Sequence, residues 1–130
     1  DDQTQARIRL EKEAIVFILA RVAAEELQWL SSSAMRGEIN QTPDPVRRYR
    51  MLSVLSMATE SIKVTKEAEG RSTELIEFGF KPFDALHLAL AEQGSVDIFL
   101  TVDDQLTRLA KRLEGKVRVP VSNPLTWIRE

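Results

Sequence analysis

Two stretches of the sequence decide the predicted fold: residues 82–91, PFDALHLALA, and residues 98–104, IFLTVDD. The first begins with a proline, which suits the first turn of a helix, and continues as a nearly unbroken apolar run. The second is an apolar strand that ends in two aspartates. In an open α/β sheet the ligand crevice lies at the carboxyl ends of the strands. We therefore expect Asp84 and Asp103 to converge at one rim of the sheet.

Helical and extended patterns alternate along the rest of the chain. Helix start signals occur at Ser32 or Ser33, at Asp44 and at Thr65. This alternation predicts an α/β fold in which helices cover both faces of a central parallel sheet, giving three α/β/α layers. Because no repeat, linker or low-complexity tract occurs, residues 1–130 are expected to form a single domain. Strand-like segments are expected at residues 27–30, 61–64, 97–100 and 117–119.

Composition excludes several classes of function. A hydrophobic fraction of 43% and a charged fraction of 29% are those of a soluble globular protein, and no membrane partner is expected. The chain has no cysteine, which excludes thiol catalysis and fits a reducing cytoplasm. The single histidine, His87, excludes a site built from several histidines. A net charge of −2 argues against a general nucleic-acid coating protein but leaves a nuclease open.

Each aspartate also has a purely structural explanation. Asp84 follows a helix-starting proline and could stabilise that helix by about 0.3–1 kcal/mol through the helix dipole. However, the helix is expected to be buried on most sides, Phe83 included, so a charge on it needs a partner or an opening. Asp103 could cap the next helix, or Asp104 could cap it and leave Asp103 facing the crevice. Because both cannot be simple caps, at least one of them is expected to be functional.

Other candidates come with similar alternatives. Glu38, on a short helix, is either solvated or a third site acid. His87 lies on the same side of its helix as Asp84 and is either a packed core residue or a support behind the acids. Thr101 could orient an acid or contact a phosphate, or simply be a β-branched strand residue. Arg47 and Arg48 belong either to a solvated helix face or to a rim that contacts phosphates.

Several carboxylates in close contact cannot all stay ionised without a cation. Oxygen ligands of this kind select Mg²⁺ or Mn²⁺, which points to metal-dependent phosphoryl chemistry. No serine triad, cysteine or second histidine offers a competing nucleophile and base. The expected chemistry is therefore hydrolysis with a divalent metal as cofactor.

The helix that carries Asp84 and the strand that ends at Asp103 together resemble motifs of the PIN domain family. That family shows an Asp-Ala-x-His-x-Ala helix, matched from Asp84, and then an apolar strand ending in Thr-x-Asp, matched by Thr101 and Asp103. Residues 117–127 are similar to its closing strand and Asn-Pro segment, and residues 31–39 to its strand and helix with a second acid. The resemblance covers nearly the whole chain.

The resemblance implies a small α/β/α metal-dependent ribonuclease. Its Mg²⁺ or Mn²⁺ ligands would be Glu38, Asp84 and Asp103, with Asp104 as an adjacent fourth and His87 as a motif residue. Many bacterial members are toxins of type II toxin–antitoxin pairs, of the VapC kind, so RNA, an antitoxin protein and a second copy in a homodimer are the implied partners. An alternative is a catalytically degenerate PIN module that acts by binding protein or RNA. A phospho-acceptor signalling domain fits less well, because it needs an early acidic pair.

One departure from the family concerns the beginning of the chain. PIN domains open with an apolar strand that ends in an aspartate, and this sequence starts where their first helix starts. We hypothesise an upstream strand and loop of about 10–15 residues, given a strand of about 5–6 residues. Without that strand and its acid, the site is expected to bind metal poorly.

Overall fold

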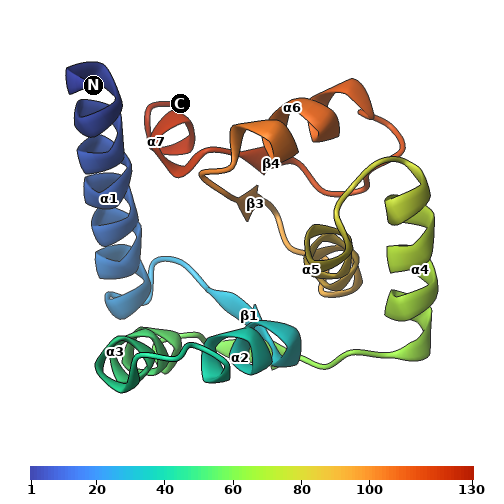
Figure 1. The fold of residues 1–130 in the computed structure, drawn as a ribbon, viewed down its shortest axis with the longest axis horizontal. Helices are drawn as coiled ribbons and strands as arrows, with labels where there is room; N and C mark the ends of the chain where they lie inside the picture. Colours follow the sequence, from blue (N-terminus) through green and yellow to red (C-terminus); the bar gives the residue numbers. More distant parts are fainter. The chain divides into compact units, whose positions relative to one another are not determined.

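A computed structural model describes all 130 residues as an α/β chain with short parallel strands (Figure 1). The chain forms two compact units, each described by itself: the central unit, Gln28–Val96, and the terminal unit, which joins Asp1–Leu27 to Asp97–Glu130. The three-layer arrangement and the single domain stay predictions. The elements are α1 (Asp2–Ala23), β1 (Leu30–Ser32), α2 (Ser33–Asn40), α3 (Pro45–Leu55), β2 (Glu60–Ile62), α4 (Lys66–Glu77), α5 (Pro82–Gln93), β3 (Phe99–Leu100), α6 (Asp104–Arg112), β4 (Val121–Ser122) and α7 (Pro124–Ile128).

In the central unit, local signals start the helices where the sequence predicts. The hydroxyl of Ser32 accepts a hydrogen bond from the Met35 amide at 3.1 Å, so Ser32 caps α2 at the end of strand β1. Asp44 caps α3 and Thr65 caps α4 in the same way. Strand β1 pairs in parallel with β2, in a register that places Leu30 opposite Glu60. Helix α2 carries Glu38. Because its cap, Ser32, is also the last residue of β1, the strand pair fixes where this helix starts.

Helices α4 and α5 pack against each other and supply most of the core of the central unit. Leu75 of α4 and Leu88 and Leu90 of α5 are at most 1% exposed. The two helices are also joined by a buried ion pair, in which the guanidinium of Arg71 donates to both carboxylate oxygens of Glu92 at 2.7 and 3.2 Å. Helix α5 is thus held against α4 through its second half.

In the terminal unit, β3 and β4 form a second parallel pair. Helix α1 packs against α7, and α6 packs against β4. Asn123 caps α7 and also donates to the carboxylate of Glu11, a side chain of α1 that is largely buried. No helix of the structure is both long enough and apolar enough to cross a bilayer.

The closing strand lies later than predicted. Val117 makes only an isolated bridge to Glu114, because Gly115, at a φ of 93°, turns the chain there. Strand β4 instead follows Pro120, whose carbonyl accepts from the Phe99 amide at 2.9 Å and sets the register with β3. The apolar alternation at residues 117–119 did not reveal the true strand position, because that position depends on where the turn at Gly115 lies.

Candidate functional site

In the central unit, the structure brings together two predicted site residues that are far apart in the sequence. Nε2 of His87, on α5, lies 3.1 Å from Oε2 of Glu38, on α2. The His87 side chain is 16% exposed and that of Glu38 is 55% exposed, so the pair lies at the surface of the unit. A protonated Nε2 donates to the carboxylate in this contact. His87 thus lies beside Glu38 at a partly exposed position, and its role as a support behind the acids stays a prediction.

Asp84 lies one turn before His87, in the first turn of α5. The cap position of this helix is Lys81, and no side chain caps it by a hydrogen bond. Asp84 lies inside the first turn and not at the cap position, and its charge is well placed for the helix dipole. Residues three apart lie on the same side of a helix, so Asp84 and the Glu38–His87 contact share one side of α5.

Phe83 departs from the expectation of a helix buried on most sides. Its side chain is 58% exposed, whereas Leu88, further along α5, is fully buried. The reason is its place in the second position of the helix, before α5 enters the core against α4. The Phe83 ring stacks on the ring of His87, with centroids 6.4 Å apart and planes at 25°.

In the terminal unit, Asp103 is the N-cap of α6. Its Oδ1 accepts from the amides of Gln105 at 2.9 Å and Leu106 at 3.3 Å. The hydroxyl of Thr101 in turn accepts from the Asp103 amide at 3.1 Å, so Thr101 orients the backbone that carries this acid. Both of these hydrogen bonds use the same carboxylate oxygen, and Asp103 is exposed.

Asp104 has a structural role that the sequence did not indicate. The guanidinium of Arg7, on α1, donates to both of its oxygens, one of them at 2.7 Å. These hydrogen bonds, and then the Arg7 charge, hold the pKa of Asp104 below its ordinary value. The sequence suggested only a cap or a site acid at this position. The only available signal was the spacing of four between Arg7 and Glu11, which form an ion pair on α1.

The two predicted substrate-contacting arginines differ in their surroundings. Nη1 of Arg48 donates to the carbonyl of Thr42 at 2.8 Å, so this guanidinium closes the loop before α3. Arg47 is exposed at the start of α3. Of the two, Arg47 is the better placed to contact a phosphate.

The donor set of these residues fits a hard divalent cation, since carboxylate oxygens are the ligands that Mg²⁺ and Mn²⁺ prefer. Glu38 and Asp84 belong to the central unit, and Asp103 and Asp104 to the terminal unit. Within each unit, no three acids or histidines lie close enough together to hold a metal ion. Joint use of Glu38, Asp84 and Asp103 therefore stays a prediction from the sequence.

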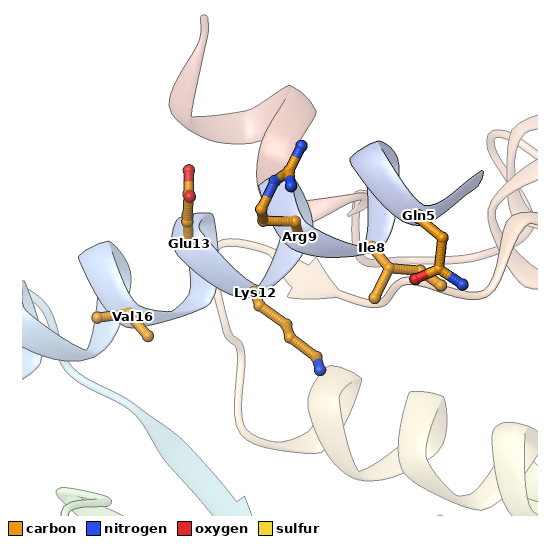
Figure 2. A pocket seen from close by; sticks show the side chains of 6 residues that line it. All are labelled: Gln5, Ile8, Arg9, Lys12, Glu13 and Val16. Atoms are coloured by element: carbon orange, nitrogen blue, oxygen red, sulfur yellow. The ribbon is translucent and has the colours of Figure 1, made fainter. Parts of the chain in front are cut away.

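A shallow pocket along α1 contains none of the predicted site residues (Figure 2). Every residue that lines it comes from this one helix, with charged and apolar side chains interspersed, and Figure 2 shows Arg9 and Glu13 on one side and Lys12 on the other. We assign no chemistry to it. The lining residues are Gln5, Ile8, Arg9, Lys12, Glu13 and Val16.

Comparison with known proteins identifies the family. The PIN domain model matches residues 1–112, which include every predicted site residue. No curated protein and no solved structure matches the chain. PIN domains are generally nucleases and typically bind divalent metals, which agrees with the acids and the α/β fold described above. The chain belongs to the PIN domain family.

Proposed function

We propose that the protein is a Mg²⁺- or Mn²⁺-dependent endoribonuclease that hydrolyses RNA phosphodiester bonds. The observation that carries the proposal is the contact of 3.1 Å between Glu38 and His87. It joins α2, which carries Glu38, to α5, which carries Asp84, so two of the family's acids come from helices that are in contact. A match to the PIN domain over residues 1–112 supports the same reaction class.

Glu38, Asp84 and Asp103 would hold the metal, with Asp104 as a fourth acid. When bound, a divalent cation lowers the pKa of water and stabilises negative charge on the phosphate group. His87 donates to Glu38 and thereby fixes the direction of that carboxylate. Thr101 fixes the backbone of Asp103.

The decisive test is Asp84→Asn, which removes the charge and keeps the shape of the side chain. We expect Mg²⁺-dependent cleavage of single-stranded RNA to be lost while the circular dichroism spectrum and melting temperature stay unchanged. Asp97→Asn is the matched control, because Asp97 is an exposed aspartate and is not one of the predicted site residues. Equal cleavage by the Asp84→Asn and wild-type proteins would refute the assignment.

A finer proposal is that the protein is a VapC-like toxin of the cytoplasm, neutralised by an antitoxin protein and active as a homodimer. Its support is the resemblance to the family and not the geometry of the site. Induced expression in a bacterial host should then arrest growth, and Asp84→Asn should relieve the arrest at equal protein level. Unimpaired growth with active, soluble protein would contradict the toxin role.

One observation favours the alternative of a degenerate PIN module. Asp103 caps α6 and Asp104 binds Arg7, so both acids of the terminal unit have structural roles that would preserve them without catalysis. Calorimetric titration with Mn²⁺ separates the two functions. A nuclease binds Mn²⁺ and loses this binding in Asp84→Asn, whereas a degenerate module shows no binding that depends on Asp84.

A further inference from the structure

The first turn of α5 presents an aromatic ring that the fold does not bury. Phe83 is 58% exposed, while Phe80, only three residues earlier, is 3% exposed and belongs to the core. Single exposed apolar residues are common on protein surfaces and need no explanation by themselves. Phe83 differs from such residues in what holds it and in what lies beside it.

The ring is fixed from behind by a chain of contacts. Phe83 stacks on His87 with an interplanar angle of 25°, and His87 is bound to Glu38 at 3.1 Å. Pro82 precedes Phe83 at the start of the helix and restricts the backbone there. An aromatic ring that is already oriented loses little conformational freedom when a flat ligand stacks on it.

Phe83 is also the direct neighbour of Asp84 in the sequence, and its ring stacks on His87, which contacts Glu38. Single-stranded RNA is recognised largely by stacking of its unpaired bases on aromatic side chains. We propose that Phe83 is the platform on which one RNA base stacks, beside the site of cleavage. This inference rests on the proposed ribonuclease function and assigns to that site a substrate-positioning residue.

The test measures binding without cleavage. A short single-stranded RNA that carries the fluorescent base 2-aminopurine is titrated with the full chain in EDTA, so that no metal supports hydrolysis. Affinity comes from fluorescence anisotropy, and stacking from the change in 2-aminopurine emission as its position is moved along the RNA. We expect the largest change at one position, where the base lies on Phe83.

Phe83→Ala should weaken RNA binding about tenfold, the size of one lost base–aromatic stack, and should remove the emission change. Phe83→Trp should restore both signals, because a flat π face is regained. Phe83→Leu keeps apolar bulk without a π face and should behave like the alanine variant. Phe17→Ala is the matched control: Phe17 lies on α1, is 52% exposed, and should leave both signals unchanged. A melting curve for each variant confirms that the fold is intact.

The outcomes separate this inference from the proposed function. Unchanged affinity in Phe83→Ala, or leucine as good as phenylalanine, overturns the stacking role even if Asp84→Asn abolishes cleavage. A change in oligomeric state in Phe83→Ala, seen by sedimentation with RNA binding unchanged, shows that the ring serves a protein interface and also overturns it. Stacking that persists while Asp84→Asn cleaves normally would instead refute the catalytic assignment. Absence of RNA binding by the wild-type protein refutes the stacking platform.

Discussion

In each unit of the chain an arginine joins two helices by binding both oxygens of a carboxylate, but the two pairs have different surroundings. In the central unit, the side chains of Arg71 and Glu92 are 11% and 5% exposed. In the terminal unit, those of Arg7 and Asp104 are 48% and 43% exposed. Breaking a buried pair leaves a charge without solvent, whereas breaking an exposed pair returns both charges to water. Similar geometry therefore predicts unequal contributions to stability.

The aspartates at the starts of α5 and α6 show a second difference between the units. Asp103 is the cap residue of α6 and accepts hydrogen bonds through its side chain, whereas Asp84 lies inside the first turn of α5, after the cap position at Lys81. Sequence reasoning gave both the same two explanations, a helix-end role or a site acid. The structure accounts for Asp103 locally, and the site role of Asp84 stays a prediction.

The largest expected effect is on the buried pair. Glu92→Gln should lower the free energy of unfolding by about 3 kcal/mol, the low end for a broken buried pair, because Arg71 keeps its contact with Glu74 at 2.9 Å. The hydrogen bonds that Arg71 donates to Glu92 raise the pKa of Arg71, and the guanidinium also stays charged without them, because arginine keeps its proton in proteins. Urea denaturation followed by circular dichroism measures the loss.

Asp104→Asn is the matched acid-to-amide change in the exposed pair, and it should lower the free energy of unfolding far less than Glu92→Gln does. Replacing both buried partners, with Arg71→Met and Glu92→Leu together, should recover much of the stability lost in Glu92→Gln. Equal losses in Glu92→Gln and Asp104→Asn would show that burial does not distinguish the two pairs.

An intermediate effect is expected at the cap of α6. Asp103→Ala should cost about 1 kcal/mol in unfolding free energy, because the amides of Gln105 and Leu106 lose their acceptor. Asp103→Asn keeps a good cap and should cost only a few tenths of a kcal/mol, about the difference between these two capping residues. Chemical denaturation of both variants gives these values.

The same two variants show whether Asp103 has a second role. If it serves the proposed site, RNA cleavage should fall by about 10²-fold or more in both, as for loss of an electrostatic contribution to catalysis. Full cleavage by Asp103→Asn would show that this aspartate only caps its helix and would restrict the site to the central unit.

The smallest effect concerns the pKa of Asp104, which Arg7 holds below the ordinary aspartate value. Because this pKa is lower in the folded chain than in the unfolded chain, the pair stabilises the fold above the ordinary value. Its contribution is lost as the pH falls through the folded-state pKa. Carboxyl carbon shifts in NMR should show the Asp104 midpoint moving up toward the ordinary value in Arg7→Gln. An unchanged midpoint would show that the ion pair does not persist in solution.

Sequence reasoning succeeded where structure is set within a few residues. Ser32, Asp44 and Thr65 were predicted to start helices, and each is the capping residue. Strand positions were less accurate, since the last strand begins at Val121 and not at Val117. A strand is defined by the strand with which it pairs, and a local sequence pattern does not show that partner. Here the turn at Gly115 and the position of Pro120 determine which residues pair with β3.

The sequence by itself determined the PIN family, the start of each acid-bearing helix and the residue types suited to a divalent metal. Only the tertiary structure decided that Glu38 meets His87, 49 residues away, and that Asp104 is bound by Arg7, 97 residues away. The physical reason is the separation of the interacting residues along the sequence. Caps and turns are hydrogen bonds between near neighbours, so residue identity specifies them. Pairing between distant side chains depends on how helices pack, which no local pattern records.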